Sequence, residues 1–306
     1  MPTVQQIANF LNLELFGHSN LNINKISPFP PKLGEISFIK NSNTIINEIL
    51  KYDNGWDGAV IADDNLNGVV DLSCSSHMFS CAPKYDLAKT YWEFFDTTRL
   101  LPKEKCIIDN NITIGASVKI DNDVEIGPGC VLLGDIKIGS GSRIGSNVVI
   151  KNKALLGKNV TILSGSVIGE NAFSFGFSKK GESIVFPSLS GVIIEDNVRI
   201  GNNVTISRGV FKDTEISCGT IIDDLTNIGN AVSIGKYCKI MANCSISGRV
   251  ILMDNCFLGR SSAVRQGVKI GCNSVLGMGS IVVSDINENV VAYGVPAKVA
   301  SSSLKS

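Results

Sequence analysis

The chain of 306 residues is long enough for one large domain or two ordinary ones. Its 28 basic and 28 acidic residues give a formal net charge of zero, which argues against nucleic-acid or anionic-membrane partners, because both need clustered positive charge. Hydrophobic residues make up 44% of the chain, so bulk disorder is excluded. No stretch approaches the roughly 20 apolar residues that cross a bilayer, and the N-terminus lacks a signal-peptide pattern.

The cysteine pattern restricts the cofactor classes. Nine cysteines are an odd number and none stands in a Cys-x-x-Cys pair, so neither a disulfide framework nor a zinc site is favoured. We therefore expect a cytoplasmic protein with no metal and no tightly bound cofactor.

Residues 1–105 have the pattern of a small α/β domain. A Thr-x-x-Gln capping box predicts a helix over residues 4–11. An apolar run at 58–62 predicts a buried strand, and apolar residues near 3.6 spacing predict an amphipathic helix over 83–96.

A six-residue repeat dominates the rest of the chain. An aliphatic residue stands at every sixth position from Ile108 to Ile168, resumes over 194–206, and continues from Ile216 to Val282 after a four-residue insertion. Glycine often follows this aliphatic residue, where we expect an unusual φ, and a small residue comes four positions after it. Because 3.6 does not divide six, the period predicts short strands whose stacked coils, about 4.8 Å apart, bury an aliphatic column.

The repeat defines three segments: the N-terminal domain, a mainly β parallel β-helix over 106–286, and a C-terminal tail over 287–306 whose Ser/Lys end we expect to be mobile. A loop over 171–191 interrupts the helix and carries aromatic residues that either line a site or pack on a neighbouring subunit. Four cysteines stand at the position of the small residue, four after the aliphatic one, which we call the small slot. We expect them to be packing residues, with a catalytic thiol or metal ligand as the alternative. They are Cys130, Cys238, Cys244 and Cys256.

These repeats resemble the left-handed β-helix acyltransferases, which are usually homotrimers. From about residue 3 to 296 the chain is similar to the UDP-3-O-acylglucosamine N-acyltransferase family of lipid A synthesis, which joins a uridine-binding domain to such a helix. In the segment that resembles the family's uracil-binding stretch, the resemblance implies that Phe38 stacks on the base and Asn41 hydrogen-bonds it. Thr44 replaces a second stacking Tyr, so the uracil sandwich is incomplete.

Further family segments carry the chemistry. Phe173 and Phe175 match a Phe-Gly-Phe loop implied to bind substrate, and Ser207 replaces the Asp of a Thr-Ile-Asp-Arg-Gly segment. Asn230 stands where the family has its catalytic His, whereas Gly248 matches the position whose backbone N–H polarises the thioester carbonyl. The only two histidines, His18 and His77, lie in the N-terminal domain.

Two carboxylates are the nearest candidate bases in the sequence, namely Asp223 and Asp224. A structural role, as turn residues that cap a coil, is equally consistent with their position. A sugar amine is partly unprotonated at neutral pH and the leaving thiolate can accept a proton, so losing the family His need not abolish catalysis.

The C-terminal segment instead resembles acetyl-CoA-dependent sugar acetyltransferases. This resemblance implies donor-binding roles for four residues, which are Gly277, Gly279, Pro296 and Lys298. It favours acyl-CoA over acyl carrier protein as the co-substrate.

The sequence therefore predicts an acyltransferase that moves an acyl group, favoured as acetyl, from a thioester to the amine of a UDP-linked amino sugar in surface-polysaccharide synthesis. The first alternative is the lipid A N-acyltransferase itself, with a displaced base. The second is a non-catalytic homologue that binds a nucleotide sugar or a partner enzyme.

Overall fold

The computed structural model describes residues 1–42, 46, 49, 56–69, 72, 76–96, 106–109 and 111–302. It divides into two compact units. Unit 1 contains residues 1–103 and 173–187, and unit 2 contains 104–172 and 188–306. No helix in the described part of the chain is long and apolar enough to cross a membrane.

Unit 1 is built on a five-stranded sheet of order β1-β5-β4-β3-β2, parallel except for the β1–β5 pair. The expected helices are present: the capping box opens α1, and the second helix continues from α3 into the π-helix η2. The bounds are α1 (Val4–Leu11), β1 (Leu15–Phe16), β2 (Lys25–Ile26), β3 (Glu35–Ile39), β4 (Ala59–Asp63), η1 (Asp64–Leu66), β5 (Ser76–Ser80), α3 (Pro83–Thr90) and η2 (Tyr91–Phe95).

The loop expected over 171–191 does not stay with the solenoid. Its middle part forms a hairpin of β15 (Phe175–Phe177) and β16 (Ser183–Val185), which belongs to unit 1. The Lys84 ammonium of α3 donates to Ser174 Oγ at 3.0 Å and to the Phe175 carbonyl at 2.8 Å, and Trp92 Nε1 donates to the Val185 carbonyl at 2.7 Å.

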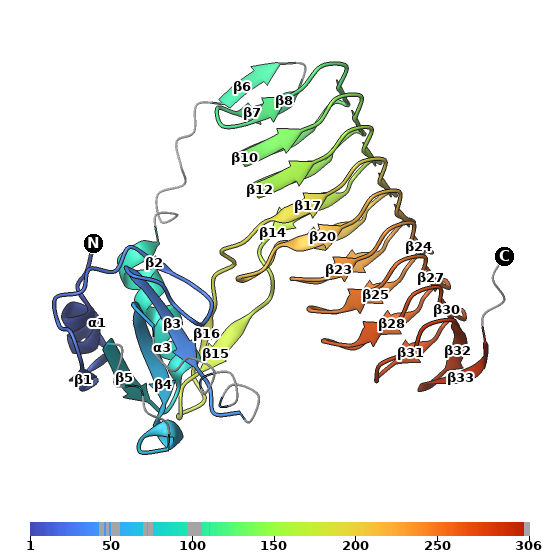
Figure 1. Cartoon of the computed structure of the whole chain (residues 1–306). Helices are drawn as coiled ribbons and strands as arrows, with labels where there is room; N and C mark the ends of the chain where they lie inside the picture. Colours follow the sequence, from blue (N-terminus) through green and yellow to red (C-terminus); the bar gives the residue numbers. More distant parts are fainter. Residues whose placement is uncertain are drawn as a thin grey trace. The chain divides into compact units, whose positions relative to one another are not determined.

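Unit 2 is the predicted parallel β-helix, with stacked coils that are visible in Figure 1. Most strands pair with the strand 18 residues further along the chain, so one coil spans three hexads and the helix has three faces. We name the faces 1, 2 and 3 in chain order. Corner A joins face 3 to face 1, corner B joins face 1 to face 2, and corner C joins face 2 to face 3.

Face 1 contains β7 (Ile112–Gly115), the first halves of β10 (Val131–Ile138) and β12 (Val149–Leu156), β14 (Val167–Glu170), β19 (Thr205–Ser207), β22 (Asn227–Ile228), β25 (Ser245–Ile246), β28 (Ala263–Val264) and β31 (Ile281–Val282). Face 2 contains β8 (Lys119–Ile120), the second halves of β10 and β12, β17 (Val192–Ile194), β20 (Thr214–Ile216), β23 (Ser233–Ile234), β26 (Ile251–Leu252) and β29 (Lys269–Ile270). Face 3 contains β9 (Glu125–Ile126), β11 (Arg143–Ile144), β13 (Thr161–Ile162), β18 (Arg199–Ile200), β21 (Ile221–Ile222), β24 (Lys239–Ile240), β27 (Phe257–Leu258), β30 (Val275–Leu276) and β32 (Val290–Gly294).

The aliphatic column is buried as predicted, from Leu132 to Val282. At the start of the helix Ile120 stays 38% exposed. There the antiparallel strand β6 (Cys106–Asp109) pairs with β7.

The four cysteines of the small slot are buried fillers, as expected. Burial raises the pKa of the Cys130 and Cys244 thiols, which disfavours the reactive thiolate.

The positive φ expected at the repeated glycines is absent at most of them, with Gly169 (φ 83°) as an exception. Gly145 and Gly229, each directly after an aliphatic residue, are not among the positive-φ residues. A β-carbon on Gly229 would lie 2.6 Å from the backbone nitrogen of Gly248, so glycine is needed there because adjacent coils approach closely. The positive φ falls two residues later in the turn, often on an asparagine such as Asn243.

Most of the C-terminal tail over 287–306 is regular structure, and its last four residues lie outside the described part of the chain. Strand β32 adds one more layer by pairing with β30, and β33 (Ala297–Ser302) folds back antiparallel onto β32. Backbone pairing rather than a free end therefore closes this side of the solenoid.

Candidate active site

Both interruptions of the hexapeptide repeat, the excursion after β14 and the four-residue insertion, lie at corner B. The excursion leaves unit 2 after β14 and returns into β17, and the four-residue insertion lies between β19 and β20. On the next coil, the turn between β22 and β23 carries Asn230. All three connections run from face 1 to face 2, so the irregular segments and Asn230 occupy successive coils of one corner.

Asn230 and Gly248 occupy equivalent positions on adjacent coils of corner B. A β-carbon on Gly248 would lie 2.5 Å from Asn230 Oδ1, so the carboxamide rests directly over the glycine. The Arg249 N–H donates to the Asn230 carbonyl at 2.8 Å, which ties the two turns together. Among the described residues, no acceptor takes the Gly248 N–H, and both residues are partly exposed. The geometry supplies one free backbone donor beside one carboxamide.

A polar network surrounds the base of the excursion. Lys151 pairs with Glu170 at 2.6 Å, and Arg208 Nε donates to Asn171 Oδ1 at 2.9 Å. Ser207, at the place of the family's Asp, lies in β19 opposite Glu170. Hydrogen bonds thus hold the excursion to the coil that precedes Asn230.

Asp213 closes this network from within the insertion. Its carboxylate accepts the Ser190 hydroxyl and the Gly191 N–H, the latter at 2.5 Å. Burial raises the pKa of Asp213, but these two hydrogen bonds and the positive charge of Lys153 outweigh it and hold the pKa below its ordinary value. Asp213 is therefore a structural anion that fastens the returning strand.

Asp223 and Asp224 lie at corner A, not beside Asn230. Asp224 Oδ1 accepts the Asn202 N–H at 2.6 Å, and the Asp224 N–H donates to Asp223 Oδ1 at 2.9 Å. Asp254 caps the Lys236 N–H at corner C in the same way, at 2.8 Å. Within one chain, the structure supports the alternative that these aspartates cap turns.

A surface groove of about 490 Å³ borders the two aspartates. Arg199 and Lys239 also line it, on face 3. The groove therefore opens on the side of corner A that faces away from corner B.

Unit 1 carries the expected nucleotide-binding residues. Phe38 is half-buried in β3, and its ring centroid lies 5.9 Å from that of Phe186, which follows the hairpin. Asn41 is exposed just after β3. Thr44 lies outside the described residues.

The aromatic hairpin presents one face outward. Phe173 is 90% exposed and contacts Phe175 edge to face at 5.3 Å, and Phe175 contacts Phe177 at 5.0 Å. Gly176 points the other way, because a β-carbon there would lie 2.9 Å from the Tyr85 backbone of α3. The open aromatic face agrees with either expected role.

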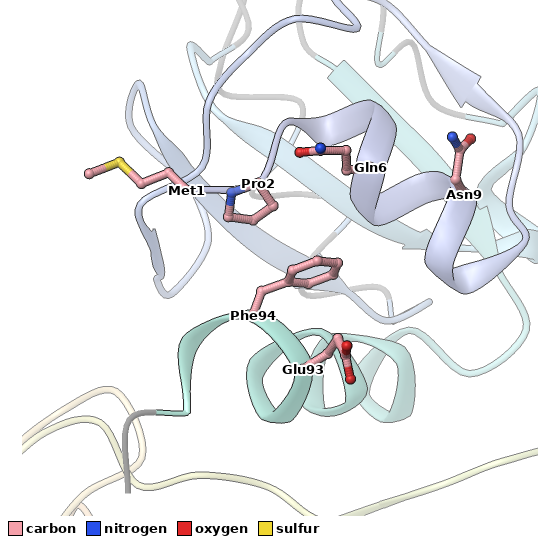
Figure 2. A pocket seen from close by; sticks show the side chains of 6 residues that line it. All are labelled: Met1, Pro2, Gln6, Asn9, Glu93 and Phe94. Carbon is pink, nitrogen blue, oxygen red and sulfur yellow. The ribbon is translucent and has the colours of Figure 1, made fainter. Parts of the chain in front are cut away.

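Unit 1 also contains a separate open pocket of about 550 Å³ between the start of α1 and η2. Figure 2 shows its lining, with Gln6 and Asn9 on α1 and Glu93 and Phe94 on η2. Gln6 is already engaged in the capping box. None of the predicted substrate residues lines this pocket.

The four predicted donor residues lie near the C-terminal end of unit 2. Gly277 and Gly279 are in a corner A turn, where a β-carbon on Gly277 would lie 2.7 Å from Tyr293 Cβ. Pro296 lies in the turn between β32 and β33, and Lys298 pairs with Tyr293 in that hairpin. All four thus lie in the last turns of unit 2, away from corner B, where Asn230 and Gly248 of the same chain lie.

In the part of the chain that the structure describes, no group of three or more His, Cys, Asp or Glu side chains is placed to hold a metal. Sequence reasoning missed Thr214 and Asp213. Asp213 lies in the connection that contains the insertion, and Thr214 directly follows it. The shift in the phase of the repeat at this point was the available signal.

Two models of hexapeptide-repeat families match the chain. The bacterial transferase hexapeptide (six repeats) matches residues 117–152, and the hexapeptide repeat of succinyl-transferase matches 181–210 and 249–284. These matches fall on unit 2, except for residues 181–187, which belong to unit 1.

Curated relatives include UDP-3-O-acylglucosamine N-acyltransferases of Methylorubrum extorquens (strain PA1) and Methylobacterium nodulans. Each is 38% identical over 125 residues, which is 40% of this chain and 36% of the relative. The match therefore spans about a third of the length of these relatives.

Solved structures with the same architecture include UDP-N-acetylglucosamine acyltransferases of Francisella novicida and Bacteroides fragilis. The first has a TM-score of 0.57 at 24% identity and covers 64% of this chain and 70% of its own. The second has a TM-score of 0.56 at 24% identity and covers 63% and 74%. The fold class of unit 2 is thus the left-handed parallel β-helix of hexapeptide repeats.

Proposed function

We propose that this protein is an acyltransferase that moves an acyl group from a thioester to the amine of a UDP-linked amino sugar in surface-polysaccharide synthesis. The observation that carries the proposal is the Asn230–Gly248 pair on adjacent coils of corner B. The relatives named for N-acyl transfer to a UDP-linked acylglucosamine support the reaction class.

The geometry suits aminolysis of a thioester. The amine lone pair attacks the carbonyl carbon, and the Gly248 N–H, which has no described acceptor, donates to the developing oxyanion. The C–N bond forms, the C–S bond breaks, and the departing thiolate takes up the proton that the amine loses. The Asn230 carboxamide orients the amine, since a carboxamide cannot act as a base at neutral pH.

Binding of the nucleotide falls to unit 1 in this proposal. Phe38 and Asn41 provide an aromatic face and an exposed carboxamide at the end of β3. Phe173 and Phe175 supply further aromatic surface for the substrate. Acyl-CoA is the favoured donor and acyl carrier protein the alternative; both are cytoplasmic thioesters.

We further propose a homotrimer that packs through face 1. On face 1 the outward residue directly before each inward aliphatic residue is uncharged, and the charged Lys151 and Glu170 near corner B pair with each other. At the same outward position face 2 carries Lys137 and Lys269, and face 3 carries Arg199 and Lys239. The outward residues of face 1 are Thr113, Val131, Val149, Val167, Thr205, Asn227, Ser245, Ala263 and Ile281. An uncharged face can be buried against another copy without the desolvation cost of unpaired charges.

Such packing would complete the site. Face 1 is bounded by corners A and B, so a cyclic assembly brings corner A of one copy towards corner B of the next. Asp223, Asp224 and Gly277 would then approach Asn230 of a neighbouring subunit.

Thiol release tests the reaction. Acetyl-CoA, longer acyl-CoAs and acyl carrier protein thioesters are offered with a panel of UDP-amino sugars, with UDP-sugars that lack the amine as controls. We expect thiol release only with the amino sugars and fastest with acetyl-CoA. Turnover restricted to a long-chain 3-hydroxyacyl carrier protein would select lipid A acylation instead.

One observation favours a second candidate, a non-catalytic nucleotide-sugar-binding protein: Asn230 cannot take up a proton. UDP-sugar binding in isothermal titration, without thiol release from any donor, would establish that role.

A further inference from the structure

Ordinary corners of the solenoid share one backbone hydrogen bond. The turn residue with positive φ donates its N–H to a carbonyl in the turn of the preceding coil. Asn243 donates to the Asp224 carbonyl at 2.9 Å at corner A, and Tyr237 donates to the Cys218 carbonyl at 3.1 Å at corner C. This bond keeps each turn in register with the coil before it.

Ala231 breaks this rule at corner B. Its φ of 54° is that of an ordinary turn residue, but the preceding coil has the connection over 208–213, which contains the four-residue insertion, where a standard turn would stand. The Ala231 N–H donates instead to Thr214 Oγ1 at 2.9 Å. The same hydroxyl donates to the Ser207 carbonyl at 2.7 Å. Thr214 thus bridges the two ends of the insertion and the Asn230 turn.

We propose that Thr214 is a positioning residue for Asn230, and that its buried hydroxyl replaces the carbonyl that the insertion removes. This inference rests on the proposed function. Ala231 directly follows Asn230, so the bond to Thr214 sets the turn from which the carboxamide reaches over Gly248. Thr214 is fully buried, so water cannot take over the bond without opening the coil.

A side-chain hydroxyl is suited to accept the Ala231 N–H because its position does not depend on the path of the backbone in the preceding coil. The insertion moves the backbone of the preceding coil away from its standard place, and the Thr214 side chain, in β20, restores the acceptor from within the solenoid. Serine would keep this acceptor, whereas valine would keep the shape and lose it.

Thr220 provides a matched control at corner C. It is equally buried, its Oγ1 donates to the Gly235 carbonyl at 2.8 Å, and it accepts the Cys238 N–H at 3.0 Å. Thr214→Val and Thr220→Val therefore remove the same kinds of bonds from the same solenoid. Only the first touches the Asn230 turn.

The test compares Thr214→Val, Thr214→Ser and Thr220→Val by melting temperature, hydrogen exchange of the peptide over 229–232, and kcat and KM. We expect both valine variants to melt at lower temperature, but only Thr214→Val to speed exchange at 229–232. We expect Thr214→Val to lower kcat by less than about tenfold, as for Asn230→Ala, because both act through the same carboxamide. Thr214→Ser should restore kcat and exchange, and Thr214→Val combined with Asn230→Ala should be no slower than Asn230→Ala alone.

Unchanged exchange at 229–232 in Thr214→Val would overturn the proposal, as would an equal loss of kcat in Thr220→Val or additive losses in the double variant. If the wild-type protein transfers no acyl group to any acceptor, the proposed function fails. Hydrogen exchange alone then decides whether Thr214 holds the turn.

Discussion

The side-chain oxygen of Asn230 occupies the space that a β-carbon on Gly248 would need, at 2.5 Å from that position. Gly248 is not among the positive-φ glycines, so the fold does not require glycine there for its backbone conformation. Pro128 occupies the equivalent turn position at corner A, which shows that the turn accepts even proline. Glycine at 248 therefore serves the neighbouring carboxamide and leaves its own N–H open.

Substitutions at 230 and 248 separate the carboxamide from the backbone donor. Asn230→Ala should lower turnover less than tenfold, because the carboxamide orients the amine without accepting its proton. Gly248→Pro removes the N–H and should lower kcat by about 10²–10³-fold or more, the usual worth of one oxyanion donor. Steady-state kinetics with the donor and acceptor found by thiol release provides the measurement.

Gly248→Ala is the control, because it adds a β-carbon and keeps the N–H. In the Asn230→Ala background its effect should shrink, since the space for the β-carbon is then free. Equal and total loss in Asn230→Ala and Gly248→Pro would contradict the assigned roles.

Asp213→Asn should destabilise the protein in a pH-dependent way. A carboxylate with a depressed folded-state pKa stabilises the fold above its unfolded pKa of about 3.9, and this stabilisation is lost as pH falls through the folded value. The variant should melt at lower temperature than wild type at pH 7, and the difference should shrink below about pH 4.

Asp135 is the control for this measurement, because it is exposed and also lies at corner B. Asp135→Asn should leave the melting temperature unchanged at both pH values. A gap between wild type and Asp213→Asn that stays constant with pH would refute the role of the charge.

A charge on face 1 should break the assembly. Ala263 is half-buried on face 1, so Ala263→Glu should convert the homotrimer to monomers and reduce turnover with it. Light scattering coupled to size exclusion gives the mass. Val275→Glu, at a half-buried outward position of face 3, should leave the trimer intact, and a trimer that survives Ala263→Glu would rule out face 1 as the interface.

The β-helix could be predicted from the sequence because each hexad repeats the same local choice: an aliphatic residue inward, a small residue near the turn. The spacing also shows which turn residues lie at the same corner, because residues 18 apart share a corner and residues six apart do not. Applied to Asp224 and Asn230, that arithmetic separates them. The function of Gly229 could not be read in this way, because only the packed neighbouring coil shows that close approach, and not φ, demands it.

The role of Thr214 could not be predicted from the sequence for a similar reason. In the sequence it is one more polar residue after an irregular stretch, and its importance depends on a carbonyl that the insertion displaces. The sequence likewise marks 171–191 as an interruption of the solenoid but not as a hairpin of unit 1, because its attachment to α3 depends on Lys84, which is 90 residues earlier than Ser174.

That attachment has a consequence for how the chain is made on the ribosome. The N-terminal unit receives its last segment only at residue 187, after the stretch over 104–172 has been synthesised. Until then Lys84 and Trp92 lack the acceptors that the hairpin provides. The first unit to emerge is thus completed only after the first coils of unit 2 have been synthesised, and a nascent chain cut before residue 173 leaves unit 1 open along α3.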